Sequence, residues 1–244
     1  EQAIIAYQEA LASAPAGSPD RPSYLYNLAG ALRKRYTQTG QPGDLEQAIS
    51  ANEYAVASTA HGSPDRALYL AGLGNGLLDQ YTLTGRTADL DRAIVAYEEA
   101  VSRSPANSPD RANLLNSLGA GLNTRYARTG QLDDLERTIY AYQSAVFCTP
   151  DDSPDRAAIL SNLGNGLRAR YARTGDPADL DAAIAAHEDS VRRTPNVSPD
   201  RVGYLNNLGN ALNTRYERSG DLADLDTAIS AYTDAVRRTP SGAP

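Results

Sequence analysis

A tetrapeptide, Ser-Pro-Asp-Arg, recurs every 45 residues along the chain, and no gap or insertion breaks its register. It begins at Ser18, Ser63, Ser108, Ser153 and Ser198. A tyrosine, a glycine and an Asp-Leu pair recur with the same step, starting at Tyr36, Gly40 and Asp44. Self-similarity at a fixed period of this size is the signature of repeat architectures. We therefore expect an elongated array in which each unit contacts mainly its neighbours.

The first half of each unit predicts a helix, helix A. In the unit 108–152, Ser108 is expected to cap the helix, Pro109 to occupy its first position and Asp110 to complement its dipole. Four apolar residues then recur at spacings of three and four and form one helical face: Leu115, Leu118, Leu122 and Tyr126. Gly130 supplies the left-handed residue that ends the helix. Glycines inside helix A, such as Gly72, Gly74 and Gly76, predict close helix–helix contact, because they cost helix stability otherwise.

The second half of each unit predicts a shorter helix, helix B. Asp134 is expected to cap it, and its inner face carries Ile139, Tyr142, Ala145 and Val146. An arginine near the end of helix A recurs at Arg35, Arg125, Arg170 and Arg215. These arginines are expected to neutralise the helix C-terminus and to pair with Asp on the following helix B.

The repeat predicts one domain, 1–244, with eleven helices. Residues 1–17 form helix B of a partial unit, and five full units follow at 18–62, 63–107, 108–152, 153–197 and 198–242. The chain starts in mid-repeat at Glu1 and contains no Met, so we expect a segment of a longer protein. Its ends should then leave apolar residues uncovered: Ile4 and Tyr7 at one end, and Ile229, Tyr232 and Val236 at the other.

Composition narrows the possible functions. The net charge is −7, which argues against non-specific nucleic-acid binding. The one cysteine rules out an internal disulfide, and no apolar run reaches the roughly 18 residues of a membrane helix. No signal-peptide pattern opens the chain. We expect a cytoplasmic protein with no membrane, nucleic-acid, cofactor or metal partner.

The spacing within each unit resembles the tetratricopeptide repeat (TPR). The unit from 63 supplies the residues of that motif: Leu70, Leu73-Gly74, Leu77, Ala93, Tyr97, Ala100 and Pro105. The resemblance implies an all-α solenoid that forms a right-handed superhelix. The 45-residue period exceeds the common one, and such long variants resemble arrays found beside caspase-like CHAT domains or signalling ATPase domains in bacteria and fungi. Four positions depart from the motif and are expected to loosen the array locally: Asn52, Ala60, Thr138 and His187.

The resemblance also implies a binding surface, because helices A of this family line a concave face that holds a peptide or a partner domain. The positions carried over as this site, with one neighbouring Asn, are Arg33, Asn75, Asn116, Asn123, Asn162, Asn165, Arg168, Asn206, Asn210 and Asn213. An Asn amide both donates and accepts, so an Asn ladder can pair with a peptide backbone. The alternative is that these Asn side chains bond adjacent helices or face water. The first position of this surface on helix A, such as Asn116 or Asn206, is not Lys in any unit. This argues against a site dedicated to clamping the C-terminal carboxylate of a partner.

Two other classes of function compete with a protein-interaction scaffold that is not an enzyme. The uncovered ends favour a module that self-assembles end to end. Cys148, His187 and His61 raise the possibility of a cysteine hydrolase, but a Cys nucleophile needs a base within hydrogen-bond reach. Cys148 aligns with polar residues in the other units, and the spacing of these three residues does not match a zinc site.

Overall fold

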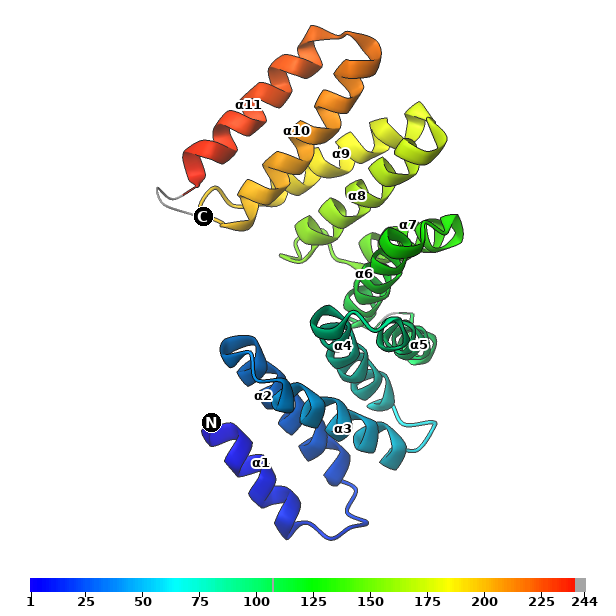
Figure 1. Ribbon diagram of the computed structural model, residues 1–244, viewed down its shortest axis with the longest axis vertical. Helices are drawn as coiled ribbons and strands as arrows, with labels where there is room; N and C mark the ends of the chain where they lie inside the picture. The colour runs from blue at the N-terminus through cyan, green and yellow to red at the C-terminus, as the bar shows by residue number, and fades with distance from the viewer. Residues whose placement is uncertain (107, 240–244) are drawn as a thin grey trace. The chain divides into compact units, whose positions relative to one another are not determined.

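The computed structural model describes residues 1–106 and 108–239, so the predicted unit ends at 107 and 242 lie outside the described residues. Within that part the chain forms eleven α-helices and no strand, which confirms the predicted all-α repeat fold (Figure 1). Helices A are α2 (Arg21–Thr39), α4 (Arg66–Thr84), α6 (Arg111–Thr129), α8 (Arg156–Thr174) and α10 (Asp200–Ser219). Helices B are α1 (Gln2–Ser13), α3 (Pro42–Ser58), α5 (Thr87–Arg103), α7 (Leu132–Cys148), α9 (Pro177–Arg193) and α11 (Leu222–Arg238).

The chain separates into two compact units, Glu1–Gly121 and Leu122–Pro244, whose boundary falls inside α6. In the first unit Ile4 packs with Leu28, Leu32 and Ala48 in one buried cluster, and Leu77 packs with Tyr97 in another. In the second unit the buried clusters join α7 with α8 and α9 with α10. Within each compact unit these clusters bury the apolar face of one helix against the next helix along the chain.

Glycine ends helix A in every unit, as the sequence predicts. Gly40 has φ +70°, and its amide donates to the carbonyl of Tyr36, four residues earlier. The equivalent glycines have φ between +68° and +72°, a region that side-chain-bearing residues rarely adopt. This left-handed residue lets the chain reverse within a short turn into helix B.

Helix A begins later than the sequence predicts. The Ser-Pro-Asp segment forms a turn in which the Ser18 Oγ accepts from the Asp20 amide at 3.3 Å, and α2 starts only at Arg21. The same 3.3 Å contact recurs in all five Ser-Pro-Asp segments, so the serine stabilises a turn before the helix and does not cap it. Helix B, by contrast, begins two residues before the predicted cap: Asp134 lies in the first turn of α7, which starts at Leu132.

The arginine of the tetrapeptide has a function that sequence analysis missed. Arg66 Nη1 donates to the carbonyl oxygens of Val56 and Thr59, at the C-terminal end of the preceding helix B. All five arginines make this pair of bonds, at 2.5–3.1 Å, to residues ten and seven positions earlier. The arginine therefore satisfies carbonyls that a helix end leaves without partners, and it ties each repeat to the one before.

The predicted Arg–Asp pairs are confirmed. Arg35 forms two parallel hydrogen bonds to Asp44 on α3, and the same fork joins three later pairs at 2.5–2.9 Å: Arg125–Asp134, Arg170–Asp179 and Arg215–Asp224. The hydrogen bond from Arg35 lowers the pKa of the Asp44 carboxyl. In the second repeat Gln80 replaces the arginine, and Asp89 pairs with Arg86 instead.

The glycines inside helix A make the close contacts that their positions predict. A Cβ on Gly74 would lie 2.6 Å from the ring of Tyr97, and one on Gly209 would lie 2.6 Å from the ring of Tyr232. His187 takes the same place against Gly164 and is fully buried. These three glycines create the space that a ring on helix B fills.

Asn52, where helix B lacks the ring, does not interrupt the fold. Its side chain is buried, and the facing position of helix A holds Ala29 where the later units have glycine. Thr138 is also fully buried, and its hydroxyl donates to the carbonyl of Asp134 at 2.7 Å. α3 and α7 remain unbroken helices, although Asn52 Oδ1 is buried with no hydrogen-bond partner within the described residues.

The expectation of an apolar edge at the N-terminal end is wrong for Ile4. Ile4 is 4% exposed, and Tyr7 packs against the same cluster, because this face of α1 covers the following helix α2. The expectation is correct for Ile229 and Val236 on α11, which are 53% and 73% exposed. Tyr232 is half-buried because its ring lies over Gly209.

Candidate functional site: the helix-A face

In each compact unit several predicted site residues lie close together on neighbouring helices A, and we call each such group with its contacts the helix-A face of that unit. In the first unit it comprises Arg33 on α2 with Asn75 and Asp79 on α4. In the second unit it comprises Ser161 and Arg168 on α8 with Asn207 and Asn210 on α10. Contacts between neighbouring helices A define it: Arg33 pairs with Asp79, and the Asn207 amide donates to Ser161 Oγ at 3.0 Å. Each unit therefore carries its own helix-A face.

Two asparagines of the predicted ladder are held by tyrosines of helix B. The Tyr97 hydroxyl donates to Asn75 Oδ1 at 2.8 Å, and the Tyr232 hydroxyl donates to Asn210 Oδ1 at the same distance. The carbonyl oxygen of each amide is thus engaged, and the Nδ2 group has no hydrogen-bond partner within the described residues. A side chain fixed in this way can donate to a ligand carbonyl without first losing rotamer freedom.

The corresponding pair in the fourth repeat lacks this bond. His187 replaces the tyrosine, and both of its ring nitrogens are buried without a hydrogen-bond partner among the described residues. Burial, together with the nearby positive charge of Arg168, lowers the pKa of His187 to about 4. Asn165 is half-buried and makes no side-chain hydrogen bond with the described residues, so both ends of its amide are available.

Arg33 and Arg168 occupy equivalent places but have different partners. Arg33 Nε forms an ion pair with Asp79, and its charge lowers the pKa of nearby Tyr97, although burial of that hydroxyl raises it more. Arg168 has Thr214 at the position equivalent to Asp79, and within residues 1–106 and 108–239 its buried Nε has no hydrogen-bond partner. Burial raises the pKa of Tyr232, and the positive charge of Arg168 lowers it in part. The second unit therefore presents a cation on the helix-A face to which the described residues offer no carboxylate partner.

Some of the other predicted residues fit the Asn ladder, and others fit the alternative in which Asn side chains bond to neighbouring residues of the chain. Asn116 and Asn162 are half-buried and already have partners, and Asn213 donates to Glu217 at 2.8 Å. Asn206 is exposed and Asn123 half-buried, and neither has a hydrogen bond with the described residues. The Asn207–Ser161 bond shows that a repeated Asn can instead link adjacent helices. The contacts of the two tyrosine hydroxyls could not be predicted, because 22 residues and a turn separate each tyrosine from its asparagine.

The residues that suggested a cysteine hydrolase do not form a site in the described part of the chain. Cys148 ends α7 and is half-buried, His61 lies in an exposed turn, and His187 is enclosed in the core. Across residues 1–106 and 108–239 no group of three or more His, Cys, Asp or Glu side chains could hold a metal ion. Over the same ranges no helix combines the length and the apolar composition needed to cross a membrane.

Comparison with solved structures places the fold among TPR proteins. BtubC (BKLC) from P. vanneervenii has a TM-score of 0.69 at 19% identity, covering 100% of this chain and 94% of that one. YrrB, described as a TPR protein with an unusual peptide-binding site, has a TM-score of 0.61 at 18% identity, covering 96% and 98%. The MamA protein has a TM-score of 0.61 at 17% identity, covering 93% and 100%. No protein-family model matches the sequence, and no curated protein matches it.

Proposed function

We propose that this chain is a TPR-type scaffold, not an enzyme, and that it binds an extended, acidic segment of a partner protein on the helix-A face. Arg168 carries the proposal, because a half-buried guanidinium with no anionic partner among the described residues favours a ligand that brings one. The similarity of fold to YrrB, a protein with a peptide-binding site, supports this class of function.

Asn210 and Asn165 would hold the backbone of such a segment. Asn210 Nδ2 is directed by the Tyr232 hydroxyl and offers a donor to a peptide carbonyl. Asn165, on the adjacent helix A, offers both a donor and an acceptor. Arg168 is on the same helix as Asn165 and would donate two parallel hydrogen bonds to a carboxylate of the ligand. In the first unit Asp79 already neutralises Arg33, so we expect the acidic preference to reside in the second unit.

Selection of a random peptide library against the purified chain tests this proposal. We expect the enriched peptides to carry Asp or Glu, and Arg168→Gln to weaken their binding roughly tenfold or more, the usual effect of losing a charged hydrogen bond. Arg173→Gln, which removes the same charge from an exposed site near the end of α8, is the matched control and should change affinity little. Enriched peptides without acidic residues, or equal binding by Arg168→Gln, would refute the acidic ligand.

Self-association through α11 is the second candidate function. Ile94 and Ile184 are buried at 1% and 3% exposure, whereas the equivalent Ile229 is 53% exposed beside Val236. An uncovered apolar stripe of this kind favours contact with another protein surface. We expect light scattering to show a mass that rises with concentration and that Ile229→Asp abolishes this rise. A constant monomer mass up to high concentration would exclude this function.

A further inference from the structure

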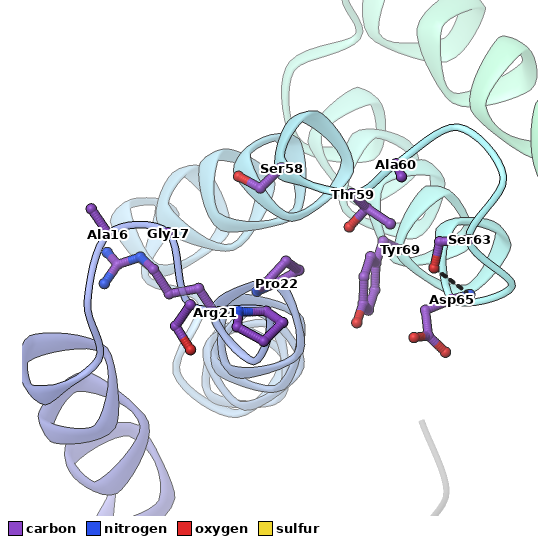
Figure 2. A pocket seen from close by; sticks show the side chains of 12 residues that line it. Ala16, Gly17, Arg21, Pro22, Ser58, Thr59, Ala60, Ser63, Asp65 and Tyr69 are labelled. Atoms are coloured by element: carbon purple, nitrogen blue, oxygen red, sulfur yellow. Dashed lines mark hydrogen bonds between the residues drawn. The ribbon is translucent and has the colours of Figure 1, made fainter.

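A pocket lies between two successive Ser-Pro-Asp turns of the first unit, at the ends of the helices and apart from the helix-A face (Figure 2). One wall is the turn that joins α1 to α2, with Gly17, Ser18 and Pro22. The other wall is the turn that joins α3 to α4, with Ser63 and Asp65. Tyr69 closes the pocket, whose volume is about 300 Å³. This size is at the lower limit of ligand sites and suits one side chain better than a large molecule.

Tyr69 brings an unsatisfied polar group to this pocket. Its side chain is 5% exposed, and its hydroxyl has no hydrogen-bond partner within the described residues. Figure 2 shows that the hydroxyl points into the space between Pro22 and Asp65. Burial, and then the charge of Asp65, raise the pKa of Tyr69, which keeps the phenol protonated and places the carboxylate near it. The residue is largely buried, but the hydroxyl oxygen itself is not fully enclosed, so a ligand in the pocket can reach it and bond to it.

The charges around the pocket favour a cation. Arg21 and Asp65 are its two charged lining residues. The Arg21 guanidinium is directed at the carbonyls of Leu11 and Ala14, whereas the exposed Asp65 carboxylate forms no ion pair or side-chain hydrogen bond with the described residues. The C-terminal ends of α1 and α3 and the N-terminal ends of α2 and α4 all meet here, so their dipoles largely cancel. Arg21 keeps its positive charge in these bonds, but its Nη1 donors are engaged, so the Asp65 carboxylate is the lining charge that can pair with a ligand.

The second unit repeats this pocket with more negative charge. It lies between the turns that precede α8 and α10, has a volume of about 490 Å³, and is closed by Tyr204. Asp200 precedes Tyr204 by four residues, as Asp65 precedes Tyr69, and it raises the pKa of that tyrosine after burial does. Asp152 also lines the pocket, and Arg193, its cation, is already bonded to Asp189 and to the Asp151 carbonyl.

We infer that these two turn pockets bind the protonated amine of a lysine side chain from a partner protein. The ammonium group would donate to the Asp65 carboxylate and to the Tyr69 phenol oxygen, while its methylene stem lies against Pro22 and the tyrosine ring. In the second pocket the ammonium group would donate to the Asp200 carboxylate and to the Tyr204 phenol oxygen. The turn pockets are separate from the helix-A face. Lysine binding in the pockets can therefore be tested independently of acidic-segment binding on the helix-A face.

Titration of the intact chain with Nα-acetyl-lysine N-methylamide, followed by amide NMR, tests the inference. We expect saturable shifts at Gly17 and Ser63 in the first pocket and at Asp152 and Ser198 in the second. The Nε-acetylated form of the probe, which has no charge, is the control at equal ionic strength and should produce no saturable shift. Asp65→Asn and Tyr69→Phe should each weaken binding in the first pocket about three- to tenfold, the effect of one hydrogen bond.

The second pocket serves as the internal control, because neither substitution touches it. Its affinity should stay at the wild-type value in both variants, which also shows that the chain remains folded. The inference is overturned if the wild-type chain gives no saturable shift, if the acetylated probe binds equally well, or if both variants bind at the first pocket as the wild type does.

Discussion

Gly74→Ala is expected to lower the free energy of unfolding by about 2 kcal/mol, although alanine is the better helix former. The added methyl would lie 2.6 Å from the ring of Tyr97, which is fully buried and cannot move aside. Overpacking of this kind costs roughly 1–3 kcal/mol, more than the approximately 1 kcal/mol that alanine gains over glycine in a helix. Urea denaturation followed by circular dichroism measures the difference.

Gly30 provides the matched control on another helix A. It is exposed, and nothing lies within 4 Å of the position a Cβ would take, so Gly30→Ala should stabilise the chain by about 0.5–1 kcal/mol. In the Tyr97→Asn background, Gly74→Ala should become neutral or stabilising, because this combination reproduces the Ala29–Asn52 pair of the first full repeat. Destabilisation by Gly30→Ala equal to that by Gly74→Ala would show that ring contact is not the cause.

His187→Tyr is expected to remove a large acid sensitivity from the second unit. The pKa of His187 is lowered from 6.5 to about 4 in the folded chain, so acid favours the unfolded state, where the imidazole protonates freely. The contribution of neutral His187 to the free energy of unfolding is fully present above pH 6.5 and is lost as the pH falls toward 4. A shift of this size corresponds to about 3 kcal/mol. Arg168, the charged group that acts on His187, adds to the penalty for a second positive charge.

The test compares wild type and His187→Tyr in urea between pH 4 and pH 7.5. The other titrating groups, including Asp44 and Asp224 whose pKa values are lowered by their arginines, contribute equally to both chains and cancel in the difference. The tyrosine should also reach Asn165, as Tyr97 reaches Asn75, and stabilise the chain at neutral pH by about 1 kcal/mol. Two stability curves that run parallel over this pH range would contradict the role of His187.

Periodicity alone predicted much of the fold. The 45-residue step located the helices, and Gly40 and its equivalents marked the ends of helices A, because only a left-handed residue permits the short reversal. The Arg35–Asp44 pair also followed from sequence, since a cation near one helix end and an acid near the next helix start are brought together by the short turn. Such features depend on residues that are close in sequence.

Several features that depend on packing between helices were not predictable, although the close contacts at the glycines inside helix A were. The start of helix A was placed too early because Ser18 can cap a helix or close a turn, and the observed turn uses its hydroxyl for Asp20. Ile4 was expected to be exposed because no pattern shows which face of α1 meets α2. The candidate site was located on the correct helices, but the tyrosines that orient Asn75 and Asn210, and the absence of a carboxylate beside Arg168, required the arrangement of three helices in space.

Amide NMR of the chain bound to a library-selected acidic peptide tests the central claim of a helix-A binding face most directly. The account predicts that the largest shifts fall on α8 and α10 around Arg168 and Asn210, and that they vanish in Arg168→Gln but persist in Arg173→Gln. Shifts confined to the outer surfaces of α9 and α11, or unchanged in Arg168→Gln, would contradict it.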